Sequence, residues 1–540
     1  MLRNLLDQAA VTAQATAAVA RSGLLGPTNP AALAKGAVAV QRRGPIAGAA
    51  VAAGLRWGER PALIDELGTL SATDVDRRSN AIANAWRADG IRPGDGIAIL
   101  CRNHRGFLDA TYAAAKLGLR AVYMNTEFAG PQIRDVCERE RVSVLVFDEE
   151  YDDRAPDFAD HHYRAWTDSG EPGGAEATLE DLIRRGDPEE PPVPSEPPTI
   201  VMLTSGTTGT PKGAPRQEVG PVNAVGALLD RIPFRVKETT YIAPPMFHAL
   251  GFANLTIALT LGCTIVTRRR FAPEDFLAGL AEHRATAAIV VPAMLQRVLD
   301  LGRDKISEYD TSALRIFLCG GAQLPGAIAT EVLDTFGDVL YVIYGSTEVA
   351  YATITTPADH RVAPATVGRP ALGARVRLFD AGGREVPQGE TGRIFVSNGV
   401  EFSGYTDGNS KEVIDGVMST GDVGHFDEEG RLYIDGRDDD MIVSGGENVF
   451  PQEVEELLMK RQDLVDVAVI GVPDEEFGAR LCAFVVAAEG AEPTEEEIKA
   501  YVKENLARYK VPRDVVFLDD LPRNATGKIL KCKLAERVAS

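Results

Sequence analysis

Residues 203–213 read Leu-Thr-Ser-Gly-Thr-Thr-Gly-Thr-Pro-Lys-Gly, and they continue the apolar run Thr199-Ile-Val-Met-Leu203. The apolar run predicts a buried strand. Glycines let main-chain N–H groups approach phosphate oxygens, hydroxyl groups add donors, and the lysine supplies positive charge. The stretch therefore predicts a phosphate-binding loop at the end of a strand.

The spacing inside this loop excludes the Walker-type nucleotide-binding proteins. In that class a glycine directly precedes the lysine, and Ser or Thr follows it. Here Thr210 and Pro211 separate Gly209 from Lys212, and Gly213 comes next. An ordinary surface loop is the alternative, but such loops seldom place so many donors directly after a buried strand.

On both sides of the loop, between residues 60 and 320, short apolar runs alternate with longer helical patterns. The apolar runs lie at 97–101, 142–147, 288–291 and 315–318, and the helical patterns lie at 74–88, 108–117 and 274–283. This alternation predicts a mostly parallel sheet covered by helices. The uncharged segment 239–267 contains Pro244 and Pro245, so we predict a buried strand and loop there, not a membrane span.

The residue pattern of the sequence changes twice toward the C-terminus. Short β-like runs separated by Gly-rich turns occupy about 375–436 and predict a compact β subdomain. From residue 437 to 540 a new α+β pattern begins. We therefore predict a large domain over 57–436 and a small C-terminal domain over 437–540.

The composition limits the classes of function. The 540 residues are 45% hydrophobic and 25% charged, as is typical of a soluble globular protein. Asp and Glu number 78 against 57 Lys and Arg, a net charge of −21, which disfavours nucleic acid as a partner. The six cysteines form no C-x-x-C pair, which disfavours disulfides and thiolate metal sites and favours the cytoplasm.

Residues 1–56 differ from the rest because they are rich in alanine and basic. We predict a helical N-terminal extension for this segment. Two interpretations stay open: the extension packs on the main body, which we favour, or it makes weak peripheral contact with an anionic membrane surface. The sequence makes no prediction of oligomeric state.

Further motifs follow the phosphate loop in a fixed order and give the chain a family resemblance. They are Pro245-Met-Phe-His248, Gly320-Gly-Ala322, Tyr344-Gly-Ser-Thr-Glu348, Ser419-Thr-Gly-Asp422, Gly436-Arg-Asp-Asp-Asp-Met441 and Pro522-Arg-Asn-Ala-Thr-Gly-Lys528. With Thr204 to Gly213 they resemble the adenylate-forming superfamily, of acyl-CoA synthetase type. The resemblance implies an α/β large N-terminal domain, with two αβαβα-type sheets plus a β subdomain, and a small mobile α+β C-terminal lid domain.

The resemblance also implies two-step chemistry with ATP, Mg²⁺ and coenzyme A. It assigns Thr204, Ser205, Thr208 and Lys212 to the phosphates, with Gly206, Thr207 and Gly209 in the same loop. It assigns Glu348 to Mg²⁺, a hard cation that prefers oxygen ligands. Its nucleotide pocket comprises Gly320, Gly321, Ala322, Tyr344, Gly345, Thr347, Asp422 and Arg437.

For catalysis the resemblance names Lys528, whose charge would offset the charge that builds up at the α-phosphate. Asp439 corresponds to the family's hinge, where a rotation would exchange Lys528 for another face of the C-terminal domain. Gly445 and Gly446 match the segment that lines the pantetheine tunnel. His248 would gate the acyl pocket or shield the reacting carboxylate.

The residues around Phe247 and the expected pocket walls indicate the class of acid. Amino-acid-activating relatives carry an aspartate after the motif phenylalanine, whereas this chain has His248 after Phe247. An amino-acid substrate is therefore disfavoured. We expect apolar pocket walls at Phe247, Leu250, Phe252, Val291, Met294, Leu295 and the 320–322 loop, and such walls favour a medium- or long-chain fatty acid. Aromatic acids, an acyl carrier protein as acceptor, a light-emitting oxidase relative and a non-catalytic nucleotide-binding relative stay open as alternatives.

Overall fold

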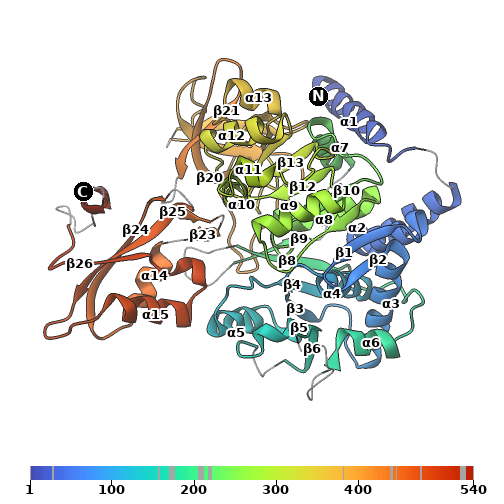
Figure 1. Cartoon of the computed structure of the whole chain (residues 1–540), viewed down its shortest axis with the longest axis horizontal. Coiled ribbons are helices and arrows are strands. Elements are labelled where there is room, and N and C mark those ends of the chain that lie inside the picture. The colour runs from blue at the N-terminus through green and yellow to red at the C-terminus, as the bar shows by residue number, and fades with distance from the viewer. Residues whose placement is uncertain are drawn as a thin grey trace.

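The computed structural model describes a large N-terminal body and a smaller C-terminal domain beside it (Figure 1). The described residues are 2–26, 30–155, 159–168, 177–204, 212–216, 222–380, 382–437, 442–445, 447–449, 451–474, 477–522, 529 and 531–538. Among them, no helix combines the length and the apolar character that crossing a bilayer requires.

The first sheet has seven strands in the described chain, in the order β7-β6-β5-β3-β4-β8-β9. The strands are β3 (Gly96–Leu100), β4 (Arg120–Tyr123), β5 (Val142–Asp148), β6 (His161–Trp166), β7 (Ala177–Thr178), β8 (Thr199–Thr204) and β9 (Lys212–Arg216). All pairs are parallel except β8 with β9, which are antiparallel on either side of the phosphate loop. The buried apolar side chains of β3 and β5 show why continuous hydrophobic runs form central strands here.

The helices of this half begin with local capping signals. They are α3 (Ala72–Ala88), α4 (Arg105–Leu117), α5 (Gly130–Arg139) and α6 (Leu179–Arg185), with a 3₁₀ turn at Glu149–Tyr151. Ser71 and Asp74 form a capping box at α3, and Thr178 and Asp181 form one at α6. These reciprocal hydrogen bonds satisfy main-chain donors that the first helical turn leaves unpaired.

The second sheet has nine strands among the described residues, in the order β16-β15-β14-β13-β12-β10-β11-β1-β2. They are β1 (Pro61–Asp65), β2 (Gly68–Ser71), β10 (Thr239–Ile242), β11 (Thr264–Val266), β12 (Ala287–Val290), β13 (Ile316–Cys319), β14 (Leu340–Tyr344), β15 (Thr353–Ile354) and β16 (Arg369–Pro370). Its helices are α7 (Val222–Arg231), α8 (Ala249–Leu261), α9 (Pro273–Glu282), α10 (Pro292–Leu299), α11 (Arg303–Ile306), α12 (Gly326–Phe336) and α13 (Pro357–Val362). The central pairs are parallel, which confirms the predicted fold class.

One sequence-based prediction for this half was wrong in part. Segment 239–267 was predicted to be strand and loop, but between β10 and β11 it contains the thirteen-residue helix α8. Most of α8 is buried or half-buried, so its apolar residues cover nearly all sides and leave no 3.6-residue periodicity to detect.

A separate antiparallel sheet follows the second one. It is formed by β17 (Arg375–Phe379), β18 (Gly392–Ser397), β19 (Val413–Ile414), β20 (Val417–Phe426) and β21 (Leu432–Arg437). Tight turns join its strands, and the last pair sets Asp422 directly opposite Arg437. Two residues predicted to bind the nucleotide therefore share one register position at this point of the sheet.

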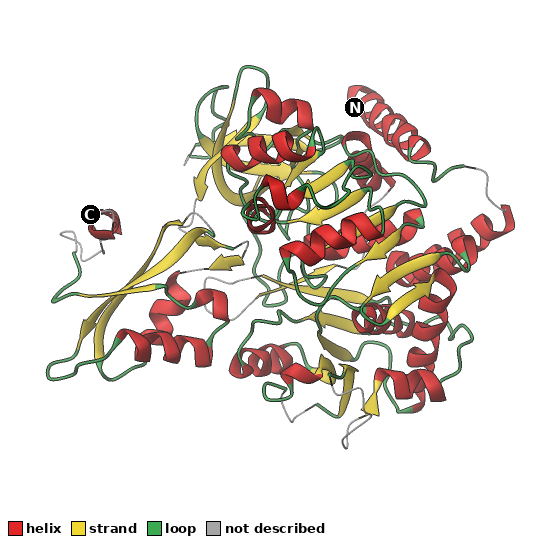
Figure 2. Cartoon of the chain, in the orientation of Figure 1, coloured by secondary structure: helices red, strands yellow, loops and turns green. Residues whose placement is uncertain are grey.

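The C-terminal domain contains a hairpin and a three-stranded sheet with helices on both faces (Figures 1 and 2). Its elements are β22 (Ile442–Ser444), β23 (Glu447–Val449), α14 (Pro451–Leu458), β24 (Leu464–Asp474), β25 (Gly478–Ala487), α15 (Glu495–Asn505), a 3₁₀ turn at Arg508–Lys510, β26 (Asp514–Phe517) and α16 (Lys531–Val538). Alternate residues of β24 face opposite sides: Val467 and Val469 pack with α14 and α15, and Ile470 packs with α16.

The N-terminal extension packs on the large body. Helix α1 (Leu2–Arg21) lies against α7, where a Cβ at Gly226 would collide with Ala15. Helix α2 (Pro30–Trp57) is broken at Gly44, which has a φ of 77°. Its two halves fold back on each other, because Gly36 packs against Ala52 and Gly48 packs against the backbone of Val40. We call this element the α2 hairpin; it also contacts α3 and α8.

Candidate active site

A cavity of about 2390 Å³ is bordered by the large body and the C-terminal domain. Its walls include the end of β8, the start of α8, the loops after β13 and β14, and strand β20. On the C-terminal side it meets the β22–β23 hairpin and the turn around Phe477. Segments that are distant in sequence therefore converge on one space.

Tyr344 and Asp422 form a pair at one wall of this cavity. The Tyr344 hydroxyl donates a hydrogen bond to Asp422 Oδ2 at 2.6 Å and lies 3.2 Å from Thr420 Oγ1. Asp422 is 7% exposed, and all three residues line the cavity. A tyrosine fixed by its hydroxyl presents a rigid ring edge and face, as an adenine site requires. The carboxylate offers two acceptor oxygens, which suit a pair of ribose hydroxyls.

Glu348 occupies a second part of the wall. Its Oε1 accepts a hydrogen bond from the Tyr405 hydroxyl at 2.6 Å, and the residue is 7% exposed while lining the cavity. Lys212 lies close by, with Nζ 5.3 Å from the centre of the Tyr405 ring and 3.8 Å from Asp407 Oδ2. A carboxylate and an ammonium at the edge of one cavity suit a Mg²⁺–triphosphate group, whose charges need partners of both signs.

The glycines of the motifs serve close packing as well as the cavity. A Cβ at Gly320 would lie 2.9 Å from Ile343 Cγ2, and Gly321 has a φ of +86°, in the left-handed region that favours glycine. Gly321 and Ala322 line the cavity, as do Gly345 and Thr347. At Gly345 a Cβ would collide with the carbonyl of Ala350, so the turn after β14 requires this glycine.

His248 joins the two domains through an ion pair. Its Nε2 lies 2.9 Å from Glu447 Oε1 on β23. Burial by itself would lower the pKa of His248, but the Glu447 carboxylate raises it above 6.5 on balance. Burial would raise the pKa of Glu447, but His248 and Lys510 bring it below 4.5. Both shifts favour the charged forms in contact.

This pair predicts a pH-dependent domain contact. A raised histidine pKa contributes stability below its ordinary value and loses it as the pH rises through the raised value, and a lowered carboxyl pKa loses its contribution as the pH falls through the lowered value. We therefore expect hydrogen–deuterium exchange in residues 442–445 and 447–449, corrected for intrinsic rates, to increase from about pH 6 to about pH 9. His248→Gln should remove that increase; an unchanged profile in this variant would contradict the assignment.

A buried amide holds the loop that leads to His248. The side chain of Asn103 donates to the Pro244 carbonyl at 2.8 Å, and its oxygen accepts from the Met246 main-chain N–H at 2.7 Å. Asn103 is 4% exposed. Two hydrogen bonds to one loop fix its position before α8 begins, and with it the start of the predicted acyl pocket.

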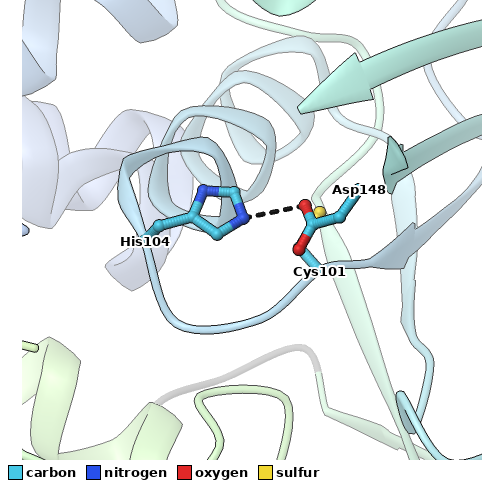
Figure 3. Close-up of side chains that lie close together, drawn as sticks. All are labelled: Cys101, His104 and Asp148. Carbon is cyan, nitrogen blue, oxygen red and sulfur yellow. Dashed lines mark hydrogen bonds and ion pairs between the residues drawn. The ribbon is translucent and has the colours of Figure 1, made fainter. Parts of the chain in front are cut away.

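The turn that carries Asn103 is fixed by a buried cluster of Cys101, His104 and Asp148 (Figure 3). The main-chain N–H of Gly106 donates to His104 Nδ1, so Nε2 carries the proton and donates to Asp148 Oδ1 at 2.8 Å. Burial raises the pKa of the Cys101 thiol well above its ordinary value, which keeps it protonated. Because the imidazole and carboxylate satisfy each other, this cluster serves as a structural support for the loop.

The structure separates the predicted site residues into three groups. Glu348, His248, Lys212, Gly321, Ala322, Tyr344, Gly345, Thr347, Asp422 and Gly445 line the cavity. Gly320 supports the wall by packing, and the backbones of Thr204 and Arg437 end β8 and β21. Ser205, Gly206, Thr207, Thr208, Gly209, Asp439, Gly446 and Lys528 lie outside the described residues.

The predicted acyl walls divide as well. Leu250, Phe252, Val291 and Met294 line the cavity, whereas Phe247 and Leu295 are buried in the hydrophobic cores. The sequence does not reveal which of these side chains reach the cavity, because packing between separate segments decides it.

Several cavity residues were missed by the sequence analysis. Tyr405, Thr420, Glu447 and Phe477 line the cavity, as does the α2 hairpin. Thr420 lies inside the quoted motif Ser419-Thr-Gly-Asp422, and Glu447 directly follows Gly445 and Gly446, so their positions in the sequence could have indicated them. Tyr405 and the hairpin carry no local signal.

Two family models match the chain. The model described as AMP-binding enzyme matches residues 51–406, and the model described as AMP-binding enzyme C-terminal domain matches residues 453–528. The first covers more than half of the chain. The protein therefore belongs to the AMP-binding family of adenylate-forming enzymes, of acyl-CoA synthetase type, and acid–thiol ligase activity is the activity that this membership supports.

Two curated relatives are similar to the chain over most of its length. The chain is 31% identical over 489 residues to the fatty acid–[acyl-carrier-protein] ligase ScoC of Streptomyces coeruleorubidus, covering 88% of this chain and 93% of ScoC. It is 34% identical over 480 residues to the indoleacetate–CoA ligase of Aromatoleum aromaticum, covering 85% and 91%. These relatives differ in both acid and acceptor.

Solved structures of o-succinylbenzoate CoA synthetase (MenE) from Bacillus subtilis share the fold. A double mutant bound to a CoA product analogue matches with a TM-score of 0.78 and 26% identity, covering 91% of this chain and 98% of MenE. The complex of MenE with AMP matches with a TM-score of 0.64 and 27% identity, covering 90% and 97%. The same relative is thus more similar when its CoA product analogue is bound.

Proposed function

We propose that the protein is an AMP-forming fatty acid–CoA ligase that uses ATP, Mg²⁺ and coenzyme A. The observation that carries this proposal is the continuity of one cavity, from Asp422 and Glu348, past His248 and Phe252, to the Gly445 turn of the C-terminal domain. A nucleotide site, an apolar pocket and an entry for a thin thiol-bearing arm then meet at one point, as transfer between bound reactants requires.

The chemistry proceeds in two substitutions. A carboxylate oxygen of the acid attacks the α-phosphorus of ATP, the new O–P bond forms, and pyrophosphate leaves. The CoA thiol releases its proton to solvent and its sulfur attacks the acyl carbonyl; the C–S bond forms, and AMP leaves with the electrons of the broken C–O bond. Activation precedes transfer because a carboxylate is a poor electrophile.

The residues divide this work by charge and position. Lys212, with Thr204, Ser205, Gly206, Thr207, Thr208 and Gly209, would hold the phosphates, and Glu348 with its Tyr405 partner would hold Mg²⁺, whose charge would neutralise phosphate oxygens when bound. Asp422, Arg437 and Tyr344 would orient the nucleoside. In the first step Lys528 would offset charge at the α-phosphate.

The two steps need two faces of the C-terminal domain. Gly445 and Glu447 line the cavity, whereas Ile529 and the described residues of α16 pack on β24 and do not line it. The higher similarity to MenE with a CoA product analogue supports the interpretation that this arrangement corresponds to thioester formation. A rotation at Asp439 would then exchange the faces, with Gly446 beside Gly445 at the pantetheine entry.

Two alternatives have specific support. The likeness to ScoC favours an acyl carrier protein as the acceptor, and the likeness to indoleacetate–CoA ligase favours an aryl acid. A nucleotide-binding protein without catalysis would not need both Glu348 and His248 to line one cavity. The cytoplasmic location and the peripheral membrane contact both stay predictions.

A substrate panel separates these possibilities. ATP–pyrophosphate exchange is measured with acetate, octanoate, palmitate, benzoate and indoleacetate, followed by thioester detection with CoA. We expect the highest kcat/KM for octanoate or palmitate, with thioester formed. Highest activity with an aromatic acid would support the aryl ligase, and exchange without thioester would support the carrier-protein ligase.

A further inference from the structure

The cavity extends well beyond the space that the nucleotide and the reacting carboxyl group need. It follows α8 from its N-cap His248 to Leu261. Its volume of about 2390 Å³ exceeds the roughly 300–1,000 Å³ of an ordinary small-molecule site. Part of this space, which we call the channel, borders α8 along its length, so the tail of a bound acid has room beside the helix.

The length of α8 sets the scale of this channel. Its thirteen residues rise about 1.5 Å each, which gives roughly 20 Å. A carbon–carbon single bond is about 1.5 Å long, so a chain needs at least about 13 bonds to span that distance. A compact aryl acid would leave most of the channel empty.

The α2 hairpin contacts α8 and borders the same cavity. Gly36, Ala49 and Ala53 on the hairpin line the channel, and Ala253 lines it on α8. These side chains are small and apolar, so they leave room for a thin hydrocarbon chain. The Trp57 indole donates to the Thr260 carbonyl at 3.3 Å and fixes the hairpin against the end of α8.

The outer end of the channel reaches the protein surface. Leu25, Leu33 and Val40 line the channel and are also 60%, 41% and 38% exposed. The basic side chain at this wall, Arg56, donates to the Leu24 carbonyl and lies over the Trp57 ring. Apolar residues therefore surround an opening to solvent, through which the end of a long chain can extend.

We propose that the α2 hairpin is the distal half of the acyl site and selects long, unbranched hydrocarbon acids. Most of the hairpin precedes residue 51, where the family match begins, so the family model does not describe this wall. The inference rests on the proposed ligase function for its substrate class, but the channel can be tested without catalysis.

The binding test uses cis-parinaric acid, a fluorescent long-chain acid, with the full-length protein and no ATP. Ala53→Phe places a ring in the channel, and Leu33→Asp places a charge at its exposed mouth. We expect each variant to raise the Kd of the acid by about tenfold or more. The reason is that losing the contacts of even one methylene in an apolar pocket costs about tenfold or more. Leu33 is exposed, so misfolding does not account for its effect.

The matched control is Ala34→Phe, the same ring on an exposed hairpin position outside the cavity wall. It should bind like the wild type. In exchange assays, Ala53→Phe should lower kcat/KM for palmitate about tenfold relative to octanoate. Absence of binding by the wild type, or equal binding by all variants, would overturn the hairpin assignment. Binding that follows the prediction without exchange for any acid would overturn only the ligase function.

Discussion

Lys528→Ala is expected to lower acyl-adenylate formation by about 10²–10³-fold and to leave thioester formation from pre-made acyl-adenylate within about twofold. The physical reason is that a cation at the α-phosphate offsets charge that exists only in the first transition state. The measurement is ATP–pyrophosphate exchange for the first half-reaction and CoA thioester release for the second.

The control for this prediction is Lys533→Ala, which removes an exposed lysine from α16. It should leave both half-reactions unchanged. Lys528→Arg tests geometry, because arginine keeps the charge but differs in shape. Equal losses in both half-reactions of Lys528→Ala would remove Lys528 from its proposed role.

Gly445→Val is expected to have the opposite effect, lowering thioester formation by about 10²-fold while adenylate formation changes by less than about threefold. Gly445 has a φ of +59°, and a Cβ there would lie 2.9 Å from the Phe477 ring. Both residues line the cavity. A branched side chain would therefore narrow the proposed pantetheine entry and strain the hairpin turn.

Backbone strain by itself is controlled with Gly490→Val. Gly490 also has a positive φ, +80°, but a Cβ there would meet open space. This variant should lose some stability and keep both half-reactions. If Gly445→Val forms thioester normally, or loses adenylation equally, the turn does not border the path of the thiol.

The fold was predictable because it depends on local patterns. The apolar runs at 97–101, 142–147 and 199–203 became β3, β5 and β8, within a residue or two at each end. Buried parallel strands are apolar on both faces, so a continuous run identifies them. Helix α8 was missed because a largely buried helix has no polar face and loses its period.

The site was predictable only in part. Tyr344, Glu348 and Asp422 stand in recognisable motifs, and the structure brings them to one cavity. The hydrogen bonds from Tyr344 to Asp422 and from Tyr405 to Glu348 join residues 78 and 57 positions apart. No pattern in the sequence indicates such pairs, because side-chain packing between separate segments decides them.

The sequence by itself determined the class of protein and most of the secondary-structure elements, and it predicted the charged residues Lys212, Glu348 and Asp422, which line the cavity. The tertiary structure alone decided that His248 meets Glu447 across the domain contact and that the α2 hairpin lines the cavity. The physical reason is that composition and periodicity report which surfaces each segment must bury, whereas the shape and length of a cavity depend on which segments bury them together.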